Sequence, residues 1–331
     1  MTPIYTATRD TLIQQGIVTA DDVYNTDNNP YLSELFDLYH EKMNEHLQGR
    51  KALLNFPPSF LYFHNDFSVN GFARTHANYK LIGIYYGSVE ILFALFEDSL
   101  EKFAGEVYQD LHDLSAKIGN PLNITFFQFF SLFVYYHEYA HLVQRAPQAF
   151  YDISEEFGNV LTAGEALEKH KREFDADWFA ATNLAMHMTQ FFKDADGNFN
   201  ATPEEVQNIA AIGLASILCY FIKSAGTVPN LYLQEKSHPH PYVRLSYCTF
   251  FLLETIAPNL PQDFPVNKPA ILTKSVQLAS IILEDEMGEV VNTFMGIFLE
   301  NVDAIEAYIQ EIIAVAIDDP FMCRNRPLDQ I

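Results

Sequence analysis

The stretch FFQFFSLFVYYHEYAHLV, residues 126–143, joins a strongly apolar run to a histidine, a glutamate and a second histidine. On an α-helix, Phe130 and Phe133 share a side with His137 and His141, because residues at these spacings lie on one face. We therefore predict a long core helix that carries polar groups on its buried side. Such groups are costly to desolvate unless they have partners, and a bound metal ion is one partner that satisfies them.

The pattern His-Glu-x-x-His within this stretch has a direct chemical interpretation. His137 and His141 are four positions apart, so both imidazoles can bind one metal ion. Glu138 is one step round the helix, beside the ion without being a natural ligand, where a base acting on water must sit. Short patterns also arise by chance, and a helix with two hydrogen-bonded histidines and no metal is the alternative.

A second acidic segment, KREFDADWFAA (171–181), offers further ligands. Catalytic zinc takes a third protein ligand and leaves one position open. Glu173 and Asp177 are four apart on a predicted helix. We predict that Glu173 is the third ligand and that Asp177 accepts a hydrogen bond from the other ring nitrogen of a histidine. His170 and Asp177 are rival ligands, and we expect Asp175 to face solvent.

Together, the two motifs resemble those of the gluzincin zinc metallopeptidases, especially the HtpX-like and CAAX-endopeptidase group. Residues 69–93 (VNGFARTHANYKLIGIYYGSVEILF) are similar to that group's Asn-Ala-Phe-Ala segment, strand and helix, and residues 237–247 (SHPHPYVRLSY) to its late His-Pro motif. There are departures: Gly71 replaces an alanine, two His-Pro pairs replace one, and the membrane helices of integral members are missing. The chain also bears a resemblance to the phage-exclusion peptidases of the Lit type.

The resemblance implies roles for other residues. The strand at residues 81–86 would be the edge strand to which an extended peptide adds, and Asn70 would line the substrate cleft. His238 would be catalytic, donating a hydrogen bond to the oxyanion, or would simply stand in a turn. His240 is the alternative to His238. Arg244 would support the site by pairing with a carboxylate beside the metal.

The composition narrows the classes of partner. The chain of 331 residues carries 20 basic and 43 acidic residues, a net charge of −23. Such a surface repels nucleic acid and anionic lipid, so we expect neither as a partner. The apolar runs at 124–136 and 206–222 are shorter than a membrane span, and we expect core helices there. The start lacks a signal-peptide pattern and three scattered cysteines suggest no disulfide framework, so we expect a cytoplasmic protein.

Local patterns predict a mainly helical α+β fold with a small sheet, and the resemblance implies a zincin-like core built on the HExxH helix. Residues 1–50 repeat apolar side chains at helical spacing. We expect strands at 59–67 and in 79–93, the second leading into a helix after Gly87. The proline-rich stretch 257–269 is the one candidate boundary. We therefore expect a metallopeptidase domain at 1–265 that includes the N-terminal helices. A C-terminal helical segment, 266–331, should pack on it.

These observations lead to a zinc-dependent endopeptidase acting on a protein or peptide substrate. The first alternative is a catalytically inactive zinc-binding module with a structural or regulatory role in protein interaction. A second alternative is a metal-dependent hydrolase acting on something other than peptides. The sequence does not identify the substrate or the oligomeric state.

Overall fold

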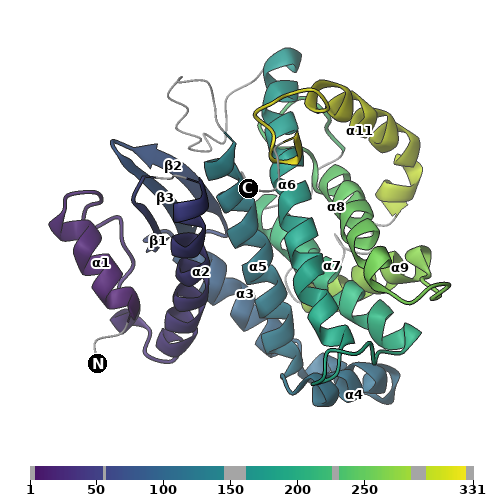
Figure 1. The fold of residues 1–331 in the computed structure, drawn as a ribbon. Coiled ribbons are helices and arrows are strands. Elements are labelled where there is room, and N and C mark those ends of the chain that lie inside the picture. Colours follow the sequence, from purple (N-terminus) through teal and green to yellow (C-terminus); the bar gives the residue numbers. More distant parts are fainter. Residues whose placement is uncertain (1–3, 55–56, 145–161, 226–230, 285–295, 326–331) are drawn as a thin grey trace.

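Helices make up most of the described residues, and one small sheet lies at one side of the larger helical group, with the N-terminal helix beyond it (Figure 1). The computed structural model describes residues 4–54, 57–144, 162–225, 231–284 and 296–325. Within these residues the fold is mainly helical α+β, which confirms the predicted fold class.

The sheet has three strands in the order β1-β3-β2. Strand β1 (Ser59–His64) runs parallel to β3 (Tyr79–Tyr85), whereas β2 (Gly71–His76) runs antiparallel to it. Only residues 77–78 connect β2 to β3, and Ala77 has a positive φ of 50° in this tight turn. The short connection makes β2 and β3 neighbours in the sheet.

The expectation of an edge strand at residues 81–86 is wrong. That segment belongs to β3, which lies in the centre of the sheet and pairs on both sides. Its run Leu81–Ile84 is buried, as expected for a central strand, because neighbouring strands and helices cover it. The edge strand that packs along the helix with the His-Glu-x-x-His motif is β2.

Helix α5 (Leu122–Val143) contains the His-Glu-x-x-His motif and lies between the sheet and two later helices. It packs along β2 on one side and along α6 (Ala163–Met188) and α7 (Pro203–Ala225) on the other. Lys80 of β3 donates a hydrogen bond to a carbonyl in the last turn of α5. The motif helix is therefore held against the sheet at the end that carries the histidines.

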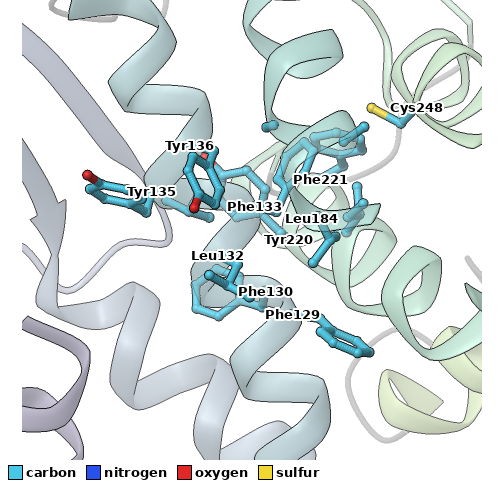
Figure 2. Close-up of a cluster of buried hydrophobic side chains, with 14 of the residues drawn as sticks. Phe129, Phe130, Leu132, Phe133, Tyr135, Tyr136, Leu184, Tyr220, Phe221 and Cys248 are labelled. Atoms are coloured by element: carbon cyan, nitrogen blue, oxygen red, sulfur yellow. The ribbon is translucent and has the colours of Figure 1, made fainter. Parts of the chain in front are cut away.

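Aromatic side chains fill the space between α5 and α7 (Figure 2). Phe133 meets Phe221 edge to face, with ring centroids 5.6 Å apart, and Phe130 lies against Tyr220 at 5.8 Å. Each fully buried phenylalanine contributes about 1.5–3 kcal/mol by leaving water. This packing confirms that the apolar half of the opening stretch is a core helix.

Helix α7 is the one helix among the described residues that is long and apolar enough to cross a membrane. Its most apolar window is 89% buried within the protein. This burial is what we expected of a core helix at residues 206–222.

The other helices enclose this centre. Helix α1 (Ile4–Gln14) and α2 (Ser33–Leu54) pack on β1, and α3 (Tyr86–Asp98) follows β3 directly and packs on α5. Three further α-helices are α4 (Gln109–Ile118), α8 (Pro241–Ile256) and α9 (Lys268–Ile282). Short 3-10 helices lie at Thr26–Asn28, Glu101–Phe103, Glu106–Tyr108, Thr189–Phe192 and Ala257–Asn259.

The C-terminal segment returns to the helices that carry the motifs. Helix α9 packs on α7, and α11 (Val302–Ala316) packs on α6 and α8. The final described element, the 3-10 helix η6 (Cys323–Asn325), also contacts α6. The end of the described chain thus lies beside the segment in which we predicted the third metal ligand.

Candidate metal centre

Helices α5 and α6 bring His137, His141 and Glu173 together, and their ligand atoms all lie within 4.8 Å of one another. The Nε2 atoms of the two histidines are 3.2 Å apart. Glu173 places Oε1 3.2 Å from His141 Nε2 and Oε2 3.4 Å from His137 Nε2. The three groups predicted as ligands therefore converge on one point.

The chemistry of this cluster fits a metal ion. Two ring nitrogens 3.2 Å apart cannot both present lone pairs to each other unless a proton or a cation lies between them. The buried Oε2 of Glu173 accepts no well-formed hydrogen bond from any residue that the structure describes. Two imidazoles and a carboxylate are also a ligand set found in catalytic zinc sites. The group could therefore hold a metal ion.

A buried acidic group, Asp177, lies beside the ring of His137. His137 Nδ1 lies 2.8 Å from Oδ1 of Asp177. Arg244 of α8 donates two hydrogen bonds to the same carboxylate, from Nε and Nη2, each at 2.8 Å. The Tyr247 hydroxyl also donates to it, at 2.7 Å. Burial would raise the pKa of Asp177, but Arg244 and His137 hold it below its usual range. Sequence reasoning missed Tyr247, although it lies one helical turn after Arg244.

The cluster concentrates charge where solvent is excluded. Burial alone would lower the pKa of His137, but the carboxylates of Asp177 and Glu173 outweigh it and raise that pKa to about 10. Burial would raise the pKa of Glu173, yet His238 and His141 bring it well below its usual range. The carboxylates thus stay ionised, and the negative potential that favours a proton on His137 equally favours a metal cation.

Glu138 is buried on the side of α5 that faces strand β2. A Cβ at Gly71 would lie 3.0 Å from Oε1 and 3.2 Å from Cγ of Glu138. Gly71, at the start of β2, therefore leaves room for this carboxylate. The gluzincin motif that this segment resembles has an alanine at that position. Asn70 directly precedes Gly71, and its backbone exchanges hydrogen bonds of 2.7 Å with the Ser88 hydroxyl. The structure thus places Asn70 beside the predicted base.

The two histidines of the His-Pro pairs have different surroundings. His238 is partly exposed, and its Nε2 lies 3.6 Å from Oε2 of Glu173. His240 is fully buried and is the N-cap of α8, where its Nδ1 accepts the Tyr242 N–H at 3.1 Å. The structure therefore brings His238 to the cluster and leaves His240 at the helix start.

The rival ligand His170 lies outside the cluster. Its Nδ1 is 2.6 Å from the Tyr308 hydroxyl of α11, and its Nε2 is 2.9 Å from the carbonyl of Lys236. A buried histidine whose two nitrogens bond a hydroxyl and a carbonyl is neutral, and burial lowers the pKa of His170 to about 4. His170 thus ties the acidic segment to the C-terminal helices.

The expectation that Asp175 faces solvent is wrong. Its side chain is fully buried and accepts hydrogen bonds from Gln144 Nε2 at 2.9 Å and from the backbone N–H groups of Cys323 and Arg324 at 2.7 and 3.1 Å. The backbone groups that cover Asp175 lie almost 150 positions further along the chain, so helical spacing could not predict that this side chain is buried. Sequence reasoning also missed Gln144, whose Oε1 lies 3.0 Å from His141 Nδ1.

Comparison with known proteins returned no relative. No protein-family model, curated protein or solved structure matches this chain. The interpretation of the site therefore depends on its motifs and on the geometry described above.

Proposed function

We propose that the protein is a zinc-dependent endopeptidase. The observation that carries this proposal is the convergence of His137, His141 and Glu173 on one point, with Glu138 adjacent on the same helix. Zinc is the metal that this ligand set favours among the ions that catalyse hydrolysis at neutral pH. The resemblance to gluzincin motifs supports the same reaction.

A zinc ion held by these residues would supply a Lewis acid that polarises a carbonyl oxygen and acidifies water. Glu138 then acts as the general base, taking a proton from the attacking water and passing it to the leaving amine. Asp177 fixes the ring of His137 through the 2.8 Å contact, and Arg244 and Tyr247 hold Asp177. His238 lies close enough to Glu173 to serve as a donor to the oxyanion that forms.

Strand β2 supports a peptide as the substrate. It is an edge strand of the sheet, it packs along α5, and its first residue, Gly71, faces Glu138. An extended peptide can add to such an edge through main-chain hydrogen bonds. This docking would place a peptide bond near the ligands, and it would depend little on the substrate's side chains because the contacts are made by the main chain.

One observation favours a second candidate, a metal-holding structural or regulatory module. His137 and Glu173 are each only 4% exposed and Glu138 only 3%. Structural zinc sites are closed, whereas catalytic sites keep a position open for water. Such a module would bind the metal and hydrolyse nothing.

Metal analysis followed by one substitution separates the two candidates. We expect about one zinc per chain after purification without chelator. Glu138→Gln should keep the metal and lose hydrolysis by about 10²–10⁴-fold, because an amide keeps the shape but cannot accept the proton. Glu254→Gln, a half-exposed residue of α8 paired with Lys268, is the matched control and should keep wild-type activity.

Each other result has a definite meaning. Metal far below stoichiometry, with no uptake of added zinc, would contradict both candidates. A protein that holds zinc but cleaves none of a broad set of unfolded proteins and peptides would be the structural module. Cleavage of another bond class, again lost in Glu138→Gln, would identify a non-peptide hydrolase.

A further inference from the structure

A continuous chain of hydrogen bonds joins the C-terminal turn to the ligand His141. The backbone N–H groups of Cys323 and Arg324 donate to Asp175, Gln144 also donates to Asp175, and Gln144 Oε1 meets His141 Nδ1. Asp175, Gln144 and Cys323 are buried, so water does not compete for these bonds. None of these three residues belongs to the motif or to its predicted partners.

The hydrogen-bond pattern determines which way the Gln144 amide points. Its Nε2 lies 2.9 Å from two acceptors, the carbonyl of Arg172 and the carboxylate of Asp175. Both contacts require the NH₂ group on that side, so the amide oxygen faces His141. The partner of a carbonyl oxygen must be an N–H, so the proton of the imidazole is on Nδ1 and Nε2 presents its lone pair to the cluster.

Asp175 in turn depends on the C-terminal turn. A buried carboxylate without donors is costly, and both backbone N–H groups that donate to Asp175 belong to η6. The turn is anchored by the ion pair of Lys171 with Asp319, whose charged atoms are 2.8 Å apart. The Asn325 side chain also donates to the carbonyl of Asp319 at 2.8 Å.

We propose that the turn formed by residues 319–325 is a positioning element of the metal centre, acting through Asp175 and Gln144 on His141. Docking of this turn selects the tautomer in which His141 binds metal, so metal affinity and docking of the turn are coupled. The inference rests on the proposed metal binding but not on peptidase activity.

The test removes one backbone donor without disturbing the side chains of the centre. In the full-length protein, Cys323→Pro deletes the N–H that bonds Asp175, and proline suits the first position of a 3-10 helix. Cys323→Ala is the matched control, because it alters the same side chain and keeps the N–H. Zinc affinity is measured by competition with a chelator, and the visible absorption of the Co²⁺-substituted protein reports the ligand geometry.

We expect Cys323→Pro to bind zinc about tenfold more weakly than Cys323→Ala, or worse, with an altered cobalt spectrum. A second arm acts on the acceptor itself: Asp175→Asn should weaken zinc binding, because an amide cannot accept from Gln144 and from both backbone N–H groups of the turn. This arm does not require proline at residue 323.

Two results would overturn the inference. One is a folded Cys323→Pro protein that matches Cys323→Ala in affinity and spectrum. The other, decisive if Cys323→Pro does not fold, is a folded Asp175→Asn protein with the zinc affinity and the cobalt spectrum of the wild type. If the wild type takes up no metal at all, the proposed function fails and this inference fails with it, whereas equal affinities among metal-binding variants refute this inference alone.

Discussion

The two histidines of the motif are supported from opposite sides by different kinds of structure. His137 is held by Asp177, which is ion-paired with Arg244 of the neighbouring helix α8. His141 is held by a neutral amide, Gln144, and through it by Asp175 and the distant C-terminal turn. The motif therefore has a histidine at each end, but the two histidines contact different kinds of group.

The difference shows what helical spacing can reveal. Asp177 lies four residues after Glu173. One local pattern therefore contains both the candidate ligand Glu173 and the carboxylate that contacts His137 of α5. The support of His141 closes only after α11 and the turn beyond it have packed on α6. Four predictions compare the two sides, beginning with the ligand that they share.

Glu173→Ala should cause the largest loss of metal affinity. Glu173 contacts both histidines, and its removal leaves two neutral ligands and an under-neutralised dication. Asp177→Asn should cost less, about 10–100-fold, because it alters only the group that orients His137. Chelator competition on both variants measures the ratio, and a larger loss for Asp177→Asn would mean that the two roles are exchanged.

The acids of the two sides should differ in their effect on stability. Asp177→Asn removes the nearer counter-charge of the buried Arg244, leaving only Glu173 at 3.9 Å, and should lower the free energy of unfolding by about 3–5 kcal/mol. Asp175→Asn disturbs only neutral donors and should cost about 1–3 kcal/mol. Denaturant titration of the two metal-free variants tests the order, and equal losses would show that the buried charge is compensated elsewhere.

Acid should weaken the packing of helix α11 on α6 through His170. The pKa of His170 in the folded protein is about 4, below its ordinary value of 6.5, so acid protonates the unfolded chain before the folded one. Its contribution to stability is complete above pH 6.5 and is lost as the pH falls towards 4. Urea unfolding between pH 7 and 4 should show a smaller loss for His170→Gln than for the wild type, and parallel curves would contradict the assignment.

Gly71→Ala should have the smallest effect of the four changes and should leave the zinc affinity unchanged. The added Cβ would press on the Glu138 carboxylate from 3.0 Å, and Glu138 is not a ligand. We expect unchanged zinc affinity and a loss of hydrolysis below the ~10²-fold expected for a 1 Å misplacement. Parallel measurement of both quantities is the check, and a loss of zinc would show that β2 supports the metal itself.

Much of the candidate site could be predicted because its parts recur at helical spacing. The structure brings the predicted ligands together and places Asp177 and Arg244 beside them. The edge strand was wrong because strand order depends on pairing between β1 and β3, which no pattern within a single strand encodes. That the protein hydrolyses peptides, that it binds zinc and that it is cytoplasmic remain predictions.

Sequence alone determined which side chains share a face of α5 or of α6, because helix geometry relates residues three or four apart without reference to the rest of the chain. Only the tertiary structure decided that Asp175, on the same short helix segment as Glu173 and Asp177, is buried. A carboxylate on a helix has the same local pattern whether water or two backbone N–H groups cover it. What covers Asp175 comes from residues 323 and 324, and contacts at such separation exist only once the chain has folded.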